Sequence, residues 1–278
     1  MPAPTLQGDT MADDVILIED RERVRYLTIN RPEKRNAITV DQLARLIESA
    51  IGAADDPSIG AVVIRGEGKA FCAGIDIDPS QMDMQYDTRT LQQELRLLEP
   101  FRRLDDLWRS PTPVIASVHG YCLGVGTDVA FHSDIVVCAD DAQFGYPIVR
   151  SMGSPPTHMW TYLAGPQWAK RMLLTGDMID GRTAERAGFV MQAVPHADLA
   201  TVTHELARKI ATVPPDLLAH NKSICNKVIE AMGRALVQEL AREQNAMGHH
   251  SPDAQEFGRI ANDQGLKAAL AWQNDKFG

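Results

Sequence analysis

The sequence predicts an α/β core followed by a helical region, and three observations support this fold class. Short runs rich in Val and Ile are typical of buried strands. They alternate with segments in which apolar residues recur every three to four positions, and beyond about residue 197 only this helical pattern remains. Alternating strands and helices are typical of a sheet covered by helices. We therefore divide the chain into an extension expected to be disordered (1–14), an α/β core (15–197) and a helical C-terminal region (198–278).

The first half of the core is expected to contain three strands and two helices. In order, these are two strands joined by a turn (15–30), a basic loop (31–36), a helix from Thr39 to residue 54, a strand (61–64) and a helix (91–108). Pro32 keeps the basic loop out of regular structure because its ring fixes φ and it has no N–H. Leu43, Leu46 and Ile47 give the helix after Thr39 an apolar face.

The second half continues the alternation. We expect a strand (113–118), a glycine-rich turn (120–126) that leads into a short helix, a strand (134–139), a strand (189–194) and, from there on, helices interrupted at 214–215 and 251–252. Proline lies at both interruptions, where it cannot continue a helix.

Composition narrows the classes of function. The 278 residues are 44% apolar and 23% charged, as in ordinary globular proteins, and the net charge is −9. An acidic balance argues against nucleic-acid or membrane partners, which favour a basic surface, but it allows a phosphate-bearing ligand bound by a local basic cluster. The four cysteines form no CxxC pair and are expected to be reduced thiols. Without a signal peptide or an apolar membrane segment, the chain is expected to be cytoplasmic.

Several familiar motifs are incomplete. Gly66–Lys69 resembles part of a phosphate-binding loop, but Ala70 replaces the required Ser or Thr. Gly124–Gly126 begins like a dinucleotide-binding turn, but Val129 stands where the third glycine belongs. His249-His250 are adjacent rather than helically spaced, so we expect a solvated surface pair and no metal site.

Two segments rich in small residues each follow an apolar strand. Lys69–Ile77 reads KAFCAGIDI, and His119–Asp128 reads HGYCLGVGTD. Open α/β folds bind ligands at the C-terminal ends of strands, and small residues let backbone N–H groups approach a ligand closely. In the second segment these amides also begin a helix, whose dipole favours negative charge. Two such donors from two loops would form an oxyanion hole, which stabilises charge that develops on a carbonyl oxygen.

Together, the two segments resemble the enoyl-CoA hydratase/isomerase (crotonase) superfamily. Further matching stretches follow in order between Val15 and Phe277: Asn30-Arg31-Pro32 with Asn36-Ala37, Asp134-Ile135, Ala142–Gly145, Leu174-Thr175-Gly176 and Ala184–Val194. The resemblance implies a spiral of repeated ββα units and C-terminal helices that build homotrimers, often paired into hexamers. It also implies an enzyme of fatty acid metabolism that binds an acyl-CoA thioester. Coenzyme A would be part of the substrate, and no separate cofactor is expected.

Matching positions imply the binding residues. The backbone N–H groups of Ile75 and Val125 would form the oxyanion hole. The remaining substrate- and CoA-binding residues would be Lys34 and Arg35 near the CoA phosphates, and Ala73, Asp76 and Ile77 near the adenine and pantetheine. For Lys34 and Arg35, a solvated basic turn is an equally good interpretation.

The resemblance breaks at the catalytic carboxylates. Hydratases of the family use two glutamates; here the first position is Asp128 and the second, within FGYPI, is Ile148. Isoleucine can neither transfer a proton nor orient water. Asp128 therefore remains as the sole acid/base candidate, and its alternative role is a salt bridge at a helix end or between subunits. The candidate pocket-lining residues are Tyr146, Ile148, Arg150 and His158, whose polar members have alternatives as a packed aromatic, a surface cation and a helix-start histidine.

Two functions of different classes fit these residues. The first is an acyl-CoA enzyme, a lyase or isomerase, that stabilises a thioester enolate. With one carboxylate it suits isomerisation, decarboxylation or thioester hydrolysis better than hydration. The second is a non-catalytic acyl-CoA-binding protein of the same fold. The retention of Asp128 favours the enzyme, and Ile148 favours the binding protein.

Overall fold

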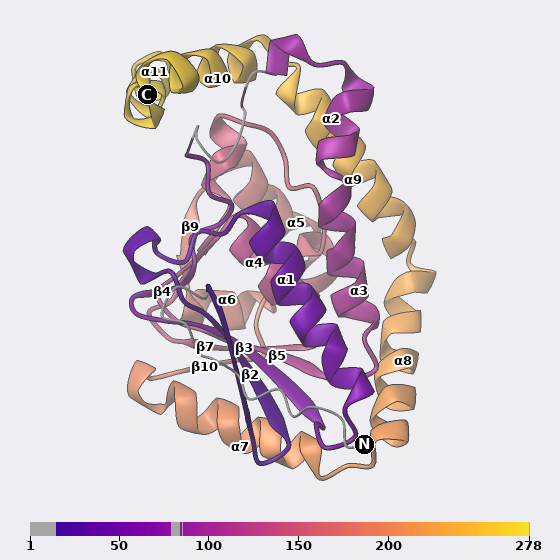
Figure 1. Ribbon diagram of the computed structural model, residues 1–278. Coiled ribbons are helices and arrows are strands. Elements are labelled where there is room, and N and C mark those ends of the chain that lie inside the picture. Colours follow the sequence, from indigo (N-terminus) through magenta and orange to yellow (C-terminus); the bar gives the residue numbers. More distant parts are fainter. Residues whose placement is uncertain (1–14, 79–83, 85, 278) are drawn as a thin grey trace, which may run out of the picture.

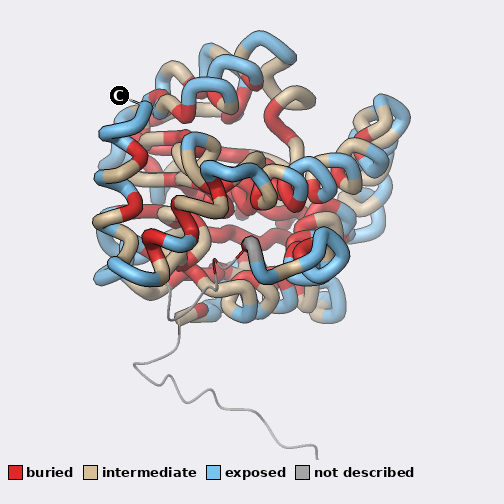
Figure 2. Tube along the Cα trace, turned by 90° about the horizontal axis from the view of Figure 1, so that it is seen from above, coloured by how far each residue is buried: buried red, intermediate tan, exposed pale blue. Residues whose placement is uncertain are grey.

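The computed structural model describes residues 15–78, 84 and 86–277. The extension at 1–14, expected to be disordered, lies outside the described residues. Within them, the strands form two sheets beneath and between helices (Figure 1). In Figure 2 the buried residues gather in the interior and the exposed ones follow the outer turns of the helices.

The larger sheet has six strands. In spatial order they are β1 (Ile16–Arg21), β2 (Val24–Ile29), β3 (Ala61–Gly66), β5 (Val114–Val118), β7 (Ile135–Ala139) and β10 (Gln192–Val194). β1 and β2 form an antiparallel hairpin, and every later pair is parallel. The hairpin turn consists of Glu22 and Arg23, both in the left-handed region, which is the geometry of a tight two-residue turn.

The smaller sheet consists of four three-residue strands. In spatial order they are β4 (Ala70–Cys72), β6 (Tyr121–Leu123), β8 (Gln143–Gly145) and β9 (Met178–Asp180). β4, β6 and β8 are mutually parallel, and each follows a strand of the larger sheet after a short turn. The helices α4 (Val125–His132) and α5 (Trp160–Thr175) come after β6 and β8. This repetition confirms the spiral of ββα units.

Helices cover both faces of the larger sheet. α1 (Val40–Ile51) lies on one face, and α7 (Leu199–Ala211) lies against the other, across β3, β5 and β7 (Figure 1). α1 begins at Thr39, whose side chain accepts from the Gln42 N–H while the Gln42 side chain accepts from the Thr39 N–H, a capping box. α6 (Gly181–Ala187) joins β9 to β10.

Three details differ from the sequence prediction. The expected helix at 91–108 is divided into α2 (Leu91–Leu97), a 3-10 turn (Glu99–Arg103) and α3 (Leu104–Arg109). Pro100 lies at this break, since proline lacks the N–H that a continuous helix needs. The expected turn at 120–126 contains β6, and the strand expected from residue 189 begins only at Gln192.

The C-terminal region is helical throughout its described length. After α7 it consists of α8 (Pro215–Ala231), α9 (Arg234–His249), α10 (Pro252–Gln264) and α11 (Leu266–Phe277), with extra breaks at Gly233 and Gly265. α8 and α9 leave large apolar side chains exposed: Leu217, Ile224, Val228, Met232, Leu236 and Leu240. Self-association through these faces stays a prediction. No described helix combines the length and apolar character needed to cross a membrane.

Candidate active site

The two glycine-containing loops meet at one edge of the smaller sheet. β4 and β6 pair in parallel, so the segments after them emerge side by side. A Cβ on Gly74 would lie 3.1 Å from the Leu123 carbonyl oxygen, and one on Gly124 would lie 3.7 Å from the Gly74 Cα. Both glycines have positive φ, +110° and +53°, which side-chain-bearing residues rarely adopt. Glycine at both positions therefore lets the loops touch.

Each loop carries a main-chain donor directly after its glycine. Ile75 follows Gly74, and Val125 follows Gly124 as the first residue of α4. Among the residues that the structure describes, neither N–H has a main-chain acceptor. Val125 is one of the N-terminal positions whose amides have no partner inside their own helix, and α4 directs its positive dipole end there. Both amides therefore follow glycines at which the two loops touch, and their role as an oxyanion hole stays a prediction.

Asp128 lies on the buried helix α4 with 2% of its surface exposed. Its Oδ1 accepts a hydrogen bond from Thr157 Oγ1 at 2.8 Å, and its Oδ2 accepts one from Tyr146 Oη at 3.1 Å. Burial raises the pKa of the carboxyl to about 7, although the two hydrogen bonds oppose that rise. The salt-bridge alternative finds no cationic partner within the described chain. A proton on Asp128 therefore exchanges near neutral pH, which suits an acid/base group.

Tyr146 is both a packed aromatic and a partner of Asp128. Its side chain is fully buried, and its ring meets Trp160 edge-on at 6.2 Å between centroids. Burial and the adjacent Asp128 raise its pKa well above the usual range, so the hydroxyl stays protonated and donates. Sequence reasoning missed Thr157, the second donor, because a single threonine in a loop has no distinguishing pattern.

Two other candidate pocket residues, Ile148 and Arg150, do not contact Asp128 through a hydrogen bond. Ile148, in the turn Pro147–Arg150, is half-buried against the main core and against a small apolar cluster under the C-terminal helices. Arg150 is exposed, and its guanidinium binds the Thr175 carbonyl oxygen at 2.5 Å. It is therefore a surface cation.

His158 lines a cavity beside α9. Its backbone N–H donates to Gln238 Oε1 at 2.7 Å, and its Nε2 lies 2.7 Å from Thr161 Oγ1. Burial lowers the pKa of the imidazole. Neither His158 nor Arg150 hydrogen-bonds to Asp128, whose partners are Tyr146 and Thr157. A catalytic role for His158 or Arg150 stays a prediction.

The basic loop (31–36) lies against the first glycine-containing loop (69–77). Asn36, fully buried, accepts from the Arg31 N–H and donates to the carbonyl oxygens of Glu67 and Ala70. The Ala73 N–H donates to the Arg35 carbonyl oxygen at 3.0 Å. The chain around Ala73 is thereby fixed beside the basic turn.

The charged side chains around this loop are of two kinds: some are exposed to solvent, and others form a buried ion pair. Lys34 and Arg35 are exposed; Lys34 Nζ lies 3.3 Å from Asp78, and the Arg35 guanidinium lies 5.4 Å from the Tyr121 ring centre. Asp76 is buried and forms a 2.6 Å ion pair with Arg31. This ion pair joins the basic loop (31–36) to the first glycine-containing loop (69–77). Contact of these residues with coenzyme A stays a prediction, as does that of Ile77, which packs against the cluster under the C-terminal helices.

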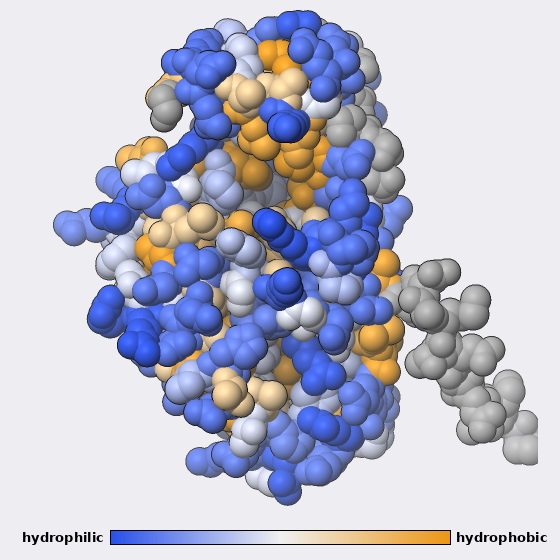
Figure 3. Space-filling model, turned by 90° about the vertical axis from the view of Figure 1, so that its left-hand side faces the viewer, coloured by the Kyte–Doolittle hydropathy of each residue, from blue (hydrophilic) through white to orange (hydrophobic). Residues whose placement is uncertain are grey.

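A cavity of about 350 Å³ opens beside Ile75. Its lining comes from the start of α1, from α2 and from the end of α9: Thr39, Val40, Ile75, Asp76, Arg89, Glu94, Leu97, Leu98, Phe101 and His249. In Figure 3 the surface is hollowed between the C-terminal helices and the rest of the chain, and hydrophobic side chains line the hollow.

The expectation of a solvated His249-His250 pair is wrong. His249 is 4% exposed, and its Nδ1 lies 2.6 Å from Oε1 of the equally buried Glu94. The end of α9 packs against the chain at Gly153, where a Cβ would lie 3.2 Å from the His249 ring, so this histidine is enclosed. Sequence reasoning also missed Glu94, which lies 155 residues away. Across 15–78, 84 and 86–277, no three His, Cys, Asp or Glu side chains are grouped so as to hold a metal ion.

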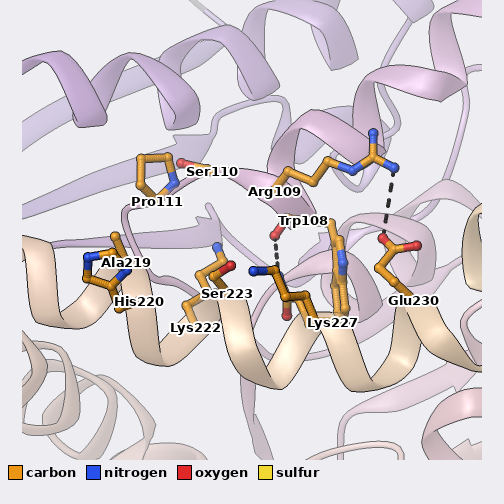
Figure 4. A pocket seen from close by; sticks show the side chains of 11 residues that line it. Trp108, Arg109, Ser110, Pro111, Ala219, His220, Lys222, Ser223, Lys227 and Glu230 are labelled. Carbon is orange, nitrogen blue, oxygen red and sulfur yellow. Dashed lines mark hydrogen bonds and ion pairs between the residues drawn. The ribbon is translucent and has the colours of Figure 1, made fainter.

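A larger cavity lies elsewhere in the described part of the chain. It measures about 560 Å³ and lies between the end of α3 and α8 (Figure 4). Asn226 Nδ2 donates to the Trp108 carbonyl oxygen at 2.9 Å, and Arg109 lies 3.8 Å from Glu230 across it. Neither the two amide-bearing residues nor Asp128 lines this cavity. It adjoins the exposed apolar face of α8, so size alone does not locate the active site.

Comparison with known proteins agrees with this geometry. The sequence model described as enoyl-CoA hydratase/isomerase matches residues 19–265. The chain belongs to the enoyl-CoA hydratase/isomerase family. It is 32% identical to a probable enoyl-CoA hydratase of Mycobacterium bovis, over 80% of this chain and 84% of the relative. It is 31% identical to the crotonyl-CoA hydratase of Syntrophomonas wolfei, over 86% and 90%.

Solved structures give the same assignment. An enoyl-CoA hydratase/isomerase from Xanthobacter autotrophicus Py2 is 31% identical and superposes with a TM-score of 0.87, over 95% of this chain and 99% of that one. The family membership and the crotonase fold inferred from the sequence are therefore confirmed.

Proposed function

We propose that the chain binds an acyl-CoA thioester and stabilises its enolate between the N–H groups of Ile75 and Val125. The observation that supports this most strongly is the contact of the two loops at Gly74 and Gly124, which brings both amides to one place. Amide donors fixed before the reaction stabilise an oxyanion more than water does, because they need no reorganisation.

Asp128 is proposed as the group that moves the proton. Its pKa of about 7 lets one carboxyl accept and return a proton at neutral pH. With Ile148 at the second carboxylate position, no second acid/base group is positioned by that turn. The proposed reaction classes are therefore those that one carboxyl serves, namely isomerisation, decarboxylation or thioester hydrolysis, and hydration of crotonyl-CoA is expected to be slow.

A non-catalytic acyl-CoA-binding protein is the second candidate, and Ile148 is the observation that favours it. Both functions require thioester binding, whereas only the first requires turnover. Calorimetric titration with a medium-chain acyl-CoA and its free acid is expected to show far tighter binding of the thioester. Absence of any thioester binding contradicts both functions.

A turnover panel then separates the two candidates. Saturated, unsaturated and α-carboxylated (malonyl-type) acyl-CoA thioesters are incubated with the protein and the products are followed by mass spectrometry. Conversion of at least one thioester supports the enzyme. Fast hydration of crotonyl-CoA would contradict the one-carboxyl mechanism, and binding without any conversion would identify a binding protein.

A further inference from the structure

The cavity beside Ile75 has an apolar wall and one polar end. Val40, Leu97 and Phe101 supply apolar surface, while Arg89, Glu94 and His249 gather together. The cavity volume of about 350 Å³ exceeds the ~150 Å³ that suffices to enclose a benzene ring. Since Ile75 lines the cavity and its N–H faces the thioester oxygen in the proposed function, the acyl group is the part of the substrate that would enter.

The polar end is built around an ionised carboxylate. Glu94 Oε1 accepts from His249 Nδ1 at 2.6 Å, and Oε2 accepts from Arg89 Nε at 2.8 Å. Burial alone would raise the pKa of Glu94, but hydrogen bonds from His249 and Arg89 outweigh it and the pKa lies below its usual range. An ionised carboxylate only accepts hydrogen bonds, so the proton of the imidazole lies on Nδ1.

This arrangement leaves His249 Nε2 as the ring nitrogen that Glu94 does not contact. The Tyr86 ring stacks on the imidazole at 4.4 Å between centroids, which restricts its rotation. Nε2 has no hydrogen-bond partner among the described residues. His249 lines the cavity, so Nε2 is the ring nitrogen that can form a hydrogen bond with a ligand there.

We propose that His249, oriented by Glu94, is a specificity-determining residue that accepts a hydrogen bond from a hydroxyl group on the acyl chain of the substrate. This rests on the proposed acyl-CoA function and adds the substrate class: thioesters whose acyl group is hydroxylated away from the carbonyl, on an alkyl chain or an aromatic ring. The apolar wall takes the intervening carbons, and Nε2 takes the hydroxyl.

Matched saturated thioesters test this without turnover. Hexanoyl-CoA is compared with 6-hydroxyhexanoyl-CoA, and 3-phenylpropanoyl-CoA with 3-(4-hydroxyphenyl)propanoyl-CoA, by calorimetric titration of the wild-type protein. One net hydrogen bond corresponds to ~2–10-fold in affinity, so in at least one pair the hydroxylated ligand is expected to bind tighter by that factor. Adipoyl-CoA, which carries a carboxylate at the same end, is expected to bind no tighter than hexanoyl-CoA.

The variant His249→Phe keeps a ring against Tyr86 and removes Nε2. It is expected to abolish the hydroxyl preference, so that hexanoyl-CoA and 6-hydroxyhexanoyl-CoA bind the variant with equal affinity. The control is His250→Phe, the same change at the neighbouring residue, whose Nε2 is buried without a partner in the described chain and which does not line the cavity. Glu94→Gln is expected to weaken the preference while retaining the ring. If His249→Phe fails to fold, the hydroxyl preference of Glu94→Gln tests the proposal instead.

The outcomes separate the two proposals. If no thioester binds, the acyl-CoA function fails. If both members of each pair bind the wild-type protein equally, only the hydroxyl assignment fails. Tighter binding of adipoyl-CoA than of the hydroxylated ligand would identify an imidazolium that selects anions and would overturn the assignment. A preference that survives His249→Phe would overturn it as well.

Discussion

Two buried carboxylates of this chain lie in opposite electrostatic surroundings. Asp128 receives hydrogen bonds from two neutral hydroxyls, Thr157 and Tyr146, and burial raises its pKa to about 7. Glu94 is as deeply buried, but the cation Arg89 and the imidazole of His249 bind it and its pKa is lowered. Burial by itself therefore does not decide the proton affinity of a carboxyl; the charge of its partners does.

Because their pKa values differ, Asp128 and Glu94 are expected to have different roles. A carboxyl that titrates near neutral pH can give and take a proton during a reaction, whereas one that stays ionised orients its neighbours and transfers nothing. Pairs of titratable groups whose surroundings push their pKa values apart are characteristic of enzyme sites. The experiments below test this contrast in order of expected effect.

Removing the titrating carboxyl is expected to have the largest effect. Asp128→Asn keeps the side-chain size but cannot transfer a proton, so turnover of the best thioester in the panel should fall by ~10²–10⁴-fold. Its affinity for a saturated acyl-CoA should change only a few-fold. Glu94→Gln, the matched change at the other carboxylate, should keep turnover of an unsubstituted thioester within ~10-fold. Equal losses in the two variants would remove the distinction.

The second effect is on stability, and its sign differs between the two sites. The pKa of Asp128 is raised from 3.8 to about 7 on folding, so the wild-type protein loses stability as pH rises through that window. About three pKa units correspond to ~4 kcal/mol. Relative to wild type, Asp128→Asn should therefore gain stability between pH 4 and pH 8.

Glu94 should show the reverse trend. Its ionised form is favoured by folding, so its stabilisation is present above the ordinary glutamate pKa and is lost as pH falls through the lowered one. Glu94→Gln should cost stability at pH 7 and progressively less on acidification. Urea unfolding of the wild-type protein and both variants at pH 4 and pH 8 measures both trends, and parallel curves for the two variants would contradict the comparison.

The smallest expected effect concerns the hydroxyls that hold Asp128. If Asp128 first acts as a base, kcat/KM rises with pH, has its inflection near pH 7 and levels off above it. The hydrogen bond from Tyr146 lowers the pKa of Asp128, so Tyr146→Phe should move the inflection to higher pH and reduce kcat/KM at pH 6 by less than ~10-fold. Tyr162→Phe, which removes a hydroxyl directed at the Met232 carbonyl oxygen, should leave the profile unchanged. An unmoved inflection in Tyr146→Phe would show that another group titrates.

The sequence predicts those helices and strands that have a capping residue, an apolar face or a long apolar run. Helix α1 has both a cap at Thr39 and an apolar face, and strands β3, β5 and β7 are runs of buried residues long enough to recognise. Strands of three residues, such as β4 and β6, are too short for periodicity to distinguish from turns. The break at Pro100 was missed because the apolar spacing continues on both sides of it.

The candidate site also has one part that the sequence predicts and another that only the tertiary structure shows. The sequence by itself determined the two glycine-containing loops, Asp128 and the absence of a carboxylate at Ile148, because each belongs to a contiguous motif whose residues are neighbours along the chain. Only the tertiary structure decided what surrounds Asp128 and that His249 meets Glu94. These contacts join helices and loops far apart in sequence, and proton affinity depends on burial and on the charge of neighbours in space, which no local pattern of residues records.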